Sequence, residues 1–171
     1  MQRPFIVCDP EKCTGCQLCE FACSSRYGGY NPLRSHIRLV RLQPTSIMSI
    51  ACRLCDEPTC LHACPRQCIS VSETTGIMLV DKDVCNGCGW CVEACEFGAV
   101  TIDHGERIVS MCNLCEDRGG QPRCIEICVY GALSLATPAE VAERRRREVV
   151  RSGVLPEMRL AWARVGAPGA P

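Results

Sequence analysis

Short apolar stretches recur along this chain, and most of them border a run of cysteines. Three alternate apolar and polar residues and follow a cysteine run: Ile69-Ser70-Val71, Val100-Thr101-Ile102 and Leu133-Ser134-Leu135. Three others precede a cysteine run: Phe5-Ile6-Val7, Ile77-Met78-Leu79-Val80 and Ile108-Val109. Alternation over so few residues is typical of short, half-buried β-strands. The pattern therefore predicts repeated units of strand, cysteine loop, short helix and strand.

Helices are predicted at two kinds of place. Three residues separate the last two cysteines of each run, as in Val92-Glu93-Ala94, and one helical turn of that length can aim a thiolate. A longer helix is predicted after the last run, because Thr137-Pro138-Ala139-Glu140 has the form of a capping box with proline at the first helical position. This charged helix continues through residues 141–150 and is expected to stop near Gly153.

Sixteen of the 18 cysteines fall into four groups of four. The groups are Cys13, Cys16, Cys19 and Cys23; Cys52, Cys55, Cys60 and Cys64; Cys85, Cys88, Cys91 and Cys95; and Cys112, Cys115, Cys124 and Cys128. The first and third groups have the spacing C-x2-C-x2-C-x3-C, which is that of bacterial ferredoxins. Thiolate is a soft ligand that suits iron–sulfur clusters. The sequence therefore predicts four [4Fe–4S] clusters and a role in electron transfer.

Two other uses of so many cysteines have to be weighed. Disulfides suit small secreted domains, but Met1-Gln2-Arg3-Pro4 opens no charged-then-apolar signal peptide. Structural zinc sites also use C-x2-C pairs, although they usually consist of two pairs separated by a longer spacer. Residues 13–19 and 85–91 instead hold three cysteines each. A zinc-binding structural or interaction module remains the alternative from another class.

The cysteines also affect how the hydrophobic content and the net charge of the chain are interpreted. The chain is 47% hydrophobic by a count that includes its 18 cysteines, and only 5% aromatic, so its conventional core is thin and folding should depend on the clusters. The formal charge is zero, with 19 basic and 19 acidic residues. Each thiolate-bound cluster adds about −2, so the basic residues are expected to balance clusters rather than bind nucleic acid. The lack of an export signal and of an apolar run of ~20 residues predicts a cytoplasmic protein without a membrane span.

The cysteine groups repeat in the order A-B-A-B. A shift of 72 residues places Cys13-Thr14-Gly15-Cys16 on Cys85-Asn86-Gly87-Cys88. The same comparison aligns the two remaining cysteines with small apolar residues, Cys68 with Ala99 and Ala132, and Cys8 with Val80. We therefore expect Cys8 and Cys68 to be buried residues without a ligand role. The isolated His36 carries no signal of its own.

This order of motifs resembles the four-cluster ferredoxin subunits of the DMSO-reductase type iron–sulfur family, over about residues 4–136. That family includes electron-transfer subunits of molybdenum and tungsten oxidoreductases, formate dehydrogenases, hydrogenases and carbon monoxide dehydrogenases. The resemblance implies an α+β fold of two bacterial-ferredoxin-like modules, one inserted in the other, with small strands and short helices around four clusters. Residues 1–46 and 105–136 would form the outer module, residues 47–104 the inserted module, and residues 137–171 a C-terminal helix and docking tail.

The resemblance also implies how the cysteines are shared. In two-cluster ferredoxins the fourth cysteine of each motif binds the other cluster. Carried over by position, with motifs two and three in one module and motifs one and four in the other, this gives four ligand sets. They are Cys13, Cys16, Cys19 and Cys128; Cys112, Cys115, Cys124 and Cys23; Cys52, Cys55, Cys60 and Cys95; and Cys85, Cys88, Cys91 and Cys64.

By the same resemblance the chain is expected to be a non-catalytic electron-transfer subunit. Its four clusters would form a relay that carries electrons between a catalytic oxidoreductase subunit and a second redox partner. The leading hypothesis for the catalytic partner is a tungsten or molybdenum aldehyde oxidoreductase, and the alternative is a hydrogenase, formate dehydrogenase or carbon monoxide dehydrogenase. Head-to-tail self-association through the two ends stays open, because a heterologous contact that does not close propagates a chain.

Overall fold

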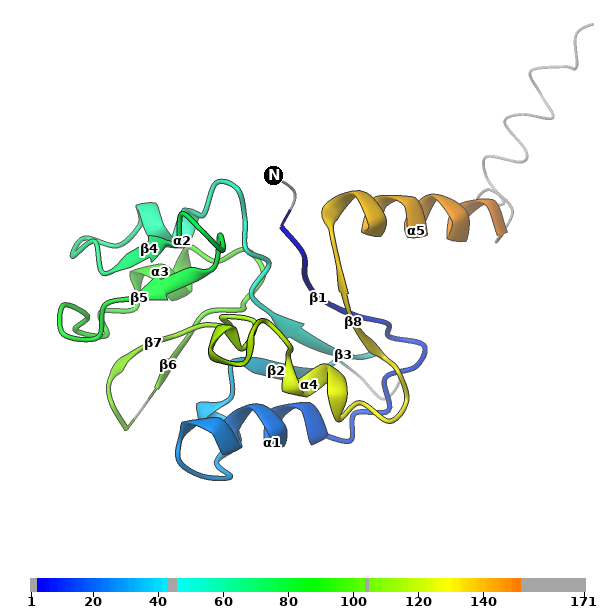
Figure 1. The fold of residues 1–171 in the computed structure, drawn as a ribbon, viewed down its shortest axis with the longest axis horizontal. Coiled ribbons are helices and arrows are strands. Elements are labelled where there is room, and N and C mark those ends of the chain that lie inside the picture. The colour runs from blue at the N-terminus through cyan, green and yellow to red at the C-terminus, as the bar shows by residue number, and fades with distance from the viewer. Residues whose placement is uncertain (1–2, 43–45, 104, 152–171) are drawn as a thin grey trace, which may run out of the picture. The chain divides into compact units, whose positions relative to one another are not determined.

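The computed structural model describes residues 3–42, 46–103 and 105–151. The described residues divide into two compact units, one of which spans Arg3–Ala136, while the other includes residues 137–151. Short helices and small antiparallel sheets make up the first unit (Figure 1). The predicted α+β fold class is therefore confirmed.

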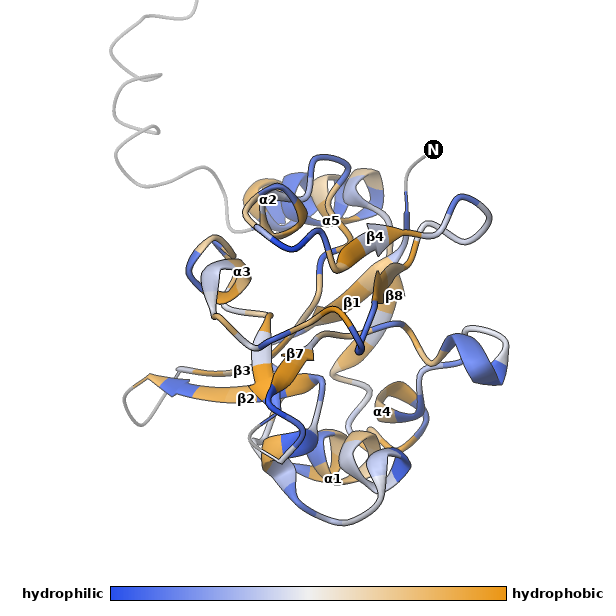
Figure 2. Cartoon of the chain, turned by 90° about the vertical axis from the view of Figure 1, so that its left-hand side faces the viewer, coloured by the Kyte–Doolittle hydropathy of each residue, from blue (hydrophilic) through white to orange (hydrophobic). Residues whose placement is uncertain are grey.

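An antiparallel strand pair joins the two ends of the first unit. Strand β1 (Phe5–Cys8) pairs with β8 (Leu133–Ala136), so that Phe5 lies opposite Ala136 and Cys8 opposite Leu133. Both strands were predicted from their apolar residues, and β1 is hydrophobic along its whole length (Figure 2). Their pairing brings the first and last cysteine motifs to the same end of the unit.

The individual strands of two of the remaining three pairs were also predicted. Strand β4 (Ile69–Val71) pairs with β5 (Met78–Val80), and β6 (Thr101–Asp103) pairs with β7 (Ile108–Ser110), each time antiparallel. The third pair consists of β2 (Ile37–Leu42) and β3 (Ser46–Ala51). It was not predicted, although its first residues alternate between apolar and basic side chains.

Each cysteine motif carries one short helix, as the spacing predicts. The helices are α1 (Leu18–Ser24), α2 (Thr59–His62), α3 (Trp90–Glu93) and α4 (Arg123–Glu126). Three short 3₁₀ helices are also present. Two of them, η1 (Ser25–Tyr27) and η2 (Pro32–Arg34), come after α1, and η3 (Glu116–Arg118) precedes α4. Helix α1 contacts α4, and α2 contacts α3. The helices of motifs one and four thus form one pair, and those of motifs two and three form another.

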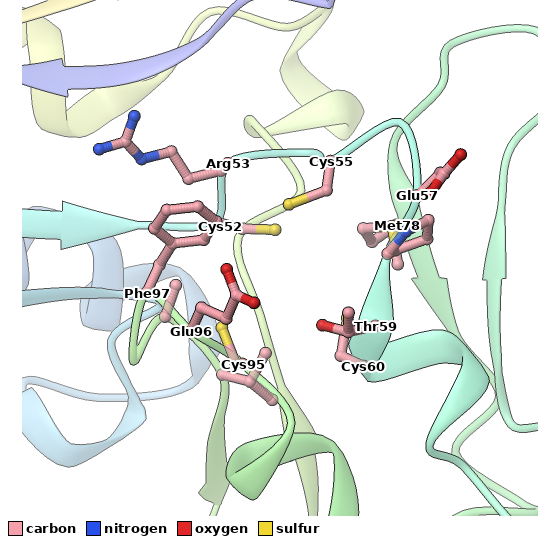
Figure 3. A pocket seen from close by; sticks show the side chains of 13 residues that line it. Cys52, Arg53, Cys55, Glu57, Thr59, Cys60, Met78, Cys95, Glu96 and Phe97 are labelled. Atoms are coloured by element: carbon pink, nitrogen blue, oxygen red, sulfur yellow. The ribbon is translucent and has the colours of Figure 1, made fainter.

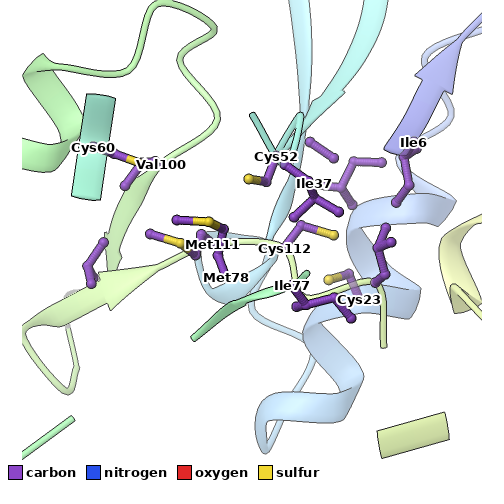
Figure 4. Close-up of a cluster of buried hydrophobic side chains, with 14 of the residues drawn as sticks. Ile6, Cys23, Ile37, Cys52, Cys60, Ile77, Met78, Val100, Met111 and Cys112 are labelled. Carbon is purple, nitrogen blue, oxygen red and sulfur yellow. The ribbon is translucent and has the colours of Figure 1, made fainter. Parts of the chain in front are cut away.

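The interior of this unit is built from aliphatic side chains and sulfur. The residues labelled in Figure 4 include Ile6, Ile37, Met78, Met111, Cys52 and Cys112. Ile37 is the most completely enclosed large side chain, with 1% of its surface exposed. Cysteines occupy many of the buried positions. The same residues that could bind clusters therefore also form part of the hydrophobic core of this unit.

Helix α5 (Pro138–Arg151) begins with the predicted capping box. The backbone N–H of Thr137 donates to Glu140 Oε2 at 2.7 Å, and the backbone N–H of Glu140 donates to Thr137 Oγ1 at 3.3 Å. None of its residues is buried. The predicted end near Gly153 and the rest of the tail lie outside the described residues. In the part of the chain that the structure describes, no helix combines the length and apolar character of a membrane span.

Candidate iron–sulfur cluster sites

One pocket gathers four cysteines from two different motifs (Figure 3). We call it site III, and its cysteines are Cys52, Cys55, Cys60 and Cys95. The first two lie in the loop after β3, the third lies in α2, and the fourth follows α3. In Figure 3 the sulfur atoms of Cys52, Cys55 and Cys95 face one shared space. The structure thus brings together one of the four sets implied by the resemblance.

Two other pockets gather cysteines from the first and fourth motifs. Site I is lined by Cys13, Cys16, Cys19 and Cys128, and site II by Cys23, Cys112, Cys115 and Cys124. In both pockets three cysteines come from one motif and the fourth comes from the other motif. The contact between α1 and α4 explains this exchange, because each helix leads into the last cysteine of its motif.

Site IV is the remaining set, Cys64, Cys85, Cys88 and Cys91. Burial raises the pKa of Cys91 to about 11, and Cys64 and Cys85 lie close enough to raise it further. The structure therefore brings these three cysteines together. Cys88 belongs to the same loop as Cys85 and is exposed.

The backbone of the first C-x2-C pair of each motif is bent in the same way. The residue directly before the second cysteine has a positive φ in all four motifs: 71° at Gly15, 50° at Leu54, 67° at Gly87 and 51° at Leu114. Glycine adopts this left-handed conformation without strain, whereas leucine does not. At Gly87 a Cβ atom would also come within 2.2 Å of the carbonyl oxygen of Arg107. The sequence repeat is thus a repeat of backbone conformation.

Two of the most deeply buried thiols at these sites, Cys52 and Cys112, resist ionisation on their own. Burial raises the pKa of Cys112 to about 12, and neighbouring Cys23, Cys52 and Cys115 add to the increase. Burial likewise raises the pKa of Cys52 to about 11, with further contributions from Cys60, Cys55 and Cys95. Converging thiolates in a buried pocket need a positive centre to offset their charge, and cluster iron supplies one. The cysteine sets therefore fit [4Fe–4S] clusters.

Cysteines of different sites influence one another's pKa values in three places. Burial is the main cause of the raised pKa values at Cys124, Cys112 and Cys91, but a cysteine of the next site adds to each. The contributing pairs are Cys19 with Cys124, Cys52 with Cys112, and Cys60 with Cys91. These pairs connect site I with site II, site II with site III, and site III with site IV. Only two of the eighteen cysteines, all of which lie in the described residues, are exposed: Cys16 of site I and Cys88 of site IV.

The two cysteines outside these sets are buried, as the repeat predicts. Cys8 is 9% exposed and Cys68 is 5% exposed. The backbone N–H of Ser49 donates to Cys8 Sγ at 3.3 Å, and Cys68 Sγ lies 3.3 Å from Cys64 Sγ. The contact between Cys68 and a cysteine of site IV was not foreseen, because it depends on the turn after motif two.

Sequence reasoning also missed three residues at site II. Arg26, Tyr27 and His36 line its pocket together with the four cysteines. Burial lowers the pKa of His36 to about 4, and the nearby charges of Arg26 and Arg38 lower it further. Arg26 and Tyr27 follow the last cysteine of motif one, but His36 reaches the pocket only through the turn that precedes β2. No spacing rule marks such a residue in the sequence.

Comparison with known proteins identifies the cofactor class. Residues 44–137 match the family described as 4Fe–4S dicluster domain. The chain belongs to this family. The expected membership among iron–sulfur proteins is therefore confirmed, and the zinc-binding alternative loses its support.

Three proteins with similar sequences are named as chains or subunits of oxidoreductases. The polyferredoxin-like subunit of an aliphatic sulfonate oxidoreductase from Pyrococcus furiosus is 40% identical over 128 residues, covering 74% of this chain and 72% of the relative. One of the chains of an anaerobic dimethyl sulfoxide reductase from Escherichia coli is 28% identical over 176 residues, covering 91% and 82%. The iron–sulfur subunit of a nitrate-inducible formate dehydrogenase from Escherichia coli is 27% identical over 172 residues, covering 84% and 57%.

Proposed function

We propose that this chain is a non-catalytic electron-transfer subunit that holds four [4Fe–4S] clusters, one at each of sites I to IV. The observation that carries the proposal is the pocket of site III, where cysteines of motifs two and three converge on one space. Sites I and II support it in the same way. When bound, a cluster supplies one-electron redox chemistry at a potential tuned by its surroundings. The chain supplies thiolates, burial and a fixed order of sites.

The row of sites provides a path with two accessible ends. Site I carries the exposed Cys16, and its pocket is lined by Tyr130, which is 55% exposed. Site IV carries the exposed Cys88, and the neighbouring Trp90 is 63% exposed. Exposed aromatic side chains are enriched where proteins contact one another. The two ends are thus suited to two different redox partners, while sites II and III lie between them.

We further propose the nested arrangement of modules. The outer module would comprise residues 1–46 and 105–136, and its support is the β1–β8 pair together with the contact between α1 and α4. The inserted module would comprise residues 47–104, and its support is the β4–β5 pair together with the contact between α2 and α3. The β2–β3 and β6–β7 pairs cross the two boundaries, so strand pairing as well as chain continuity would connect the modules.

The first partner in this proposal is a catalytic oxidoreductase subunit. The relatives named above are subunits of an aliphatic sulfonate oxidoreductase, a dimethyl sulfoxide reductase and a formate dehydrogenase. They favour an oxidoreductase complex but do not single out the hypothesis of an aldehyde oxidoreductase. The proposal has three further parts. A second redox partner binds at the other end of the relay, residues 137–171 dock onto a partner, and the protein is located in the cytoplasm.

Metal and sulfide analysis tests the proposal directly. The chain, purified without oxygen together with its partners, should contain about sixteen iron and sixteen acid-labile sulfide per chain, four of each per cluster. The matched control is a Cys60→Ser variant, which should lose the signal of one cluster and keep the other three. Stoichiometric zinc without sulfide, or half the expected iron in the unmodified chain, would contradict the proposal.

A further inference from the structure

Two buried nitrogen atoms at site II have no hydrogen-bond partner. They are Arg26 Nη1 and His36 Nδ1, and no other buried side-chain nitrogen or oxygen of the described residues lacks a partner. Both side chains line the pocket of Cys23, Cys112, Cys115 and Cys124. A buried polar group without a partner is costly and rare in folded proteins. Its occurrence twice at one cysteine pocket indicates that the pocket's occupant accepts these hydrogen bonds.

A stack of three side chains holds both nitrogens in place. The guanidinium carbon of Arg26 lies 5.5 Å from the centre of the Tyr27 ring, and the centres of the Tyr27 and His36 rings are 4.1 Å apart. The outer nitrogen of Arg26, Nη2, is bonded to the carboxylate of Asp117. The backbone N–H of His36 donates to Cys23 Sγ at 3.3 Å. Arg26 and His36 are thus each anchored at the lining of the pocket, which leaves Nη1 and Nδ1 for its contents.

The other pockets lack this combination. Two carboxylates, Glu57 and Glu96, line site III beside Arg53, whose guanidinium lies 4.9 Å from the ring centres of both Phe5 and Phe97. At site I the cation that lines the pocket is Lys12, whose side chain is 59% exposed and pairs with Asp9 at 3.4 Å, while Nη2 of the nearby Arg41 already donates to the carbonyl oxygen of Gly15. Water screens an exposed charge of this kind. An arginine whose side chain is only 11% exposed and whose buried Nη1 has no partner is therefore specific to site II among these three pockets.

We propose that Arg26 and His36 raise the reduction potential of the cluster at site II above that of the cluster at site III. The inference rests on the proposed function, because it assigns a property to one of the four clusters. Reduction adds a negative charge, and the largely buried guanidinium of Arg26, which stays protonated, stabilises that charge. Hydrogen bonds to cluster sulfur act in the same direction. An electron entering the relay then resides on the site II cluster in preference to its neighbour at site III.

Redox titration of the intact complex, followed by electron paramagnetic resonance, tests this assignment. The signal of site II is first identified as the one altered by a Cys115→Ser substitution. Arg26→Gln should then lower the midpoint potential of that signal and leave the iron content unchanged. His36→Phe keeps the ring stack on Tyr27 but removes Nδ1, and should lower the same potential by a smaller amount. Arg26→Lys keeps the charge and should restore most of the potential.

Arg118→Gln is the matched control, because it removes one positive charge from the neighbouring η3 without changing the lining of the pocket. It should leave the site II potential unchanged. The inference is overturned if four clusters are present and neither Arg26→Gln nor His36→Phe shifts that potential, or if Arg118→Gln shifts it as much. If Arg26→Gln loses the cluster, its potential cannot be measured, and the test then rests on Arg26→Lys and His36→Phe. Arg26→Lys should keep most of the site II potential and His36→Phe should lower it. Too little iron in the unmodified chain would instead contradict the proposed function.

Discussion

Cys68 Sγ lies 3.3 Å from Cys64 Sγ, and both thiols are buried. The two residues are joined by a turn in which the backbone N–H of Gln67 donates to the carbonyl oxygen of Cys64 at 3.2 Å. Burial alone would raise the pKa of Cys64, but the N–H group and thiol of Cys68, together with two other backbone N–H groups, lower it. Cys68 therefore acts on a proposed cluster ligand although the repeat aligns it with alanine.

The first prediction concerns this contact. Cys68→Ala should keep all four clusters, because the repeat has Ala99 and Ala132 at the same position, and it should cost about 1 kcal/mol of stability from lost burial. The loss of the S–H donor should lower the potential of the site IV cluster alone. Iron analysis and redox titration check both statements. Cys64→Ser is the control that should remove or alter that cluster, and loss of iron in Cys68→Ala would make Cys68 a ligand.

The turn after motif two also predicts a stabilising substitution. Gln67 has a φ of 52°, and the equivalent positions after motifs three and four hold Gly98 and Gly131 with φ values of 60° and 58°. A side chain with a Cβ is strained in this conformation, whereas glycine is not, although glycine costs entropy. Gln67→Gly should therefore stabilise the loaded chain by about 0.5 kcal/mol.

The reverse substitution provides the control for this turn. Gly98→Ala should destabilise the chain by about 1 kcal/mol, because it introduces the same strain. Both variants can be compared with the unmodified chain by anaerobic denaturation. If Gln67→Gly proves less stable than the unmodified chain, contacts of the Gln67 side chain rather than backbone strain determine this turn.

The repeat made much of the fold accessible from the sequence. Strands β1, β4, β5, β6, β7 and β8 follow from short apolar stretches beside cysteine runs, and the four short helices follow from the three-residue intervals. Such features are local, since each depends on neighbouring residues. The β2–β3 pair was missed because residues 37–42 and 46–51 lie outside the cysteine repeat that guided the interpretation.

The residues that surround the cysteines in space could be predicted from the sequence less well than the cysteine groups themselves. Arg26 and His36 meet at site II only because η1, η2 and the turn before β2 fold back onto motif one. Likewise, Arg34 reaches Asp103 across 69 positions in the sequence. Contacts of this kind arise from tertiary packing, which leaves no periodic trace in a single sequence.

The ion pair of Arg34 and Asp103 predicts a dependence on pH. Arg34 Nε lies 2.8 Å from Asp103 Oδ2, and Asp103 is 7% exposed. Burial alone would raise the pKa of Asp103, but Arg34 and the N–H groups of Glu106 and Gly105 lower it below its usual value. A carboxyl group whose folded pKa is lowered stabilises the fold above its unfolded pKa of about 3.9, and this contribution is lost as the pH falls through the folded pKa.

Asp103→Asn should remove this contribution. At pH 7 the variant should be less stable by about 1–2 kcal/mol, because the charged hydrogen bonds to Asp103 are weakened. The difference from the unmodified chain should shrink as the pH falls toward and below 4, and anaerobic denaturation at several pH values measures it. Lys82→Gln, which changes an exposed pair with Glu106, is the control and should alter stability little. A constant difference across this pH range would contradict the assignment to Asp103.

The last prediction tests how the motifs share their cysteines. Cys95 belongs to motif three in the sequence, but it lines the pocket of site III with Cys52, Cys55 and Cys60 from motif two. Cys95→Ser should therefore alter the cluster bound by motif two and leave the cluster bound by Cys85, Cys88 and Cys91 intact. The physical reason is that helix α3 contacts α2 and carries the polypeptide from site IV to site III before Cys95.

Cys64→Ser is the matched variant, since Cys64 ends motif two but approaches Cys91 of motif three. The two substitutions should produce opposite results: Cys95→Ser should change the signal that Cys55→Ser changes, and Cys64→Ser should change the signal that Cys88→Ser changes. Paramagnetic resonance of the reduced complexes compares the four variants directly. If Cys95→Ser and Cys88→Ser instead affect the same signal, each motif closes its own cluster. The crossed sets would then be wrong, and the nested modules would lose their chemical basis.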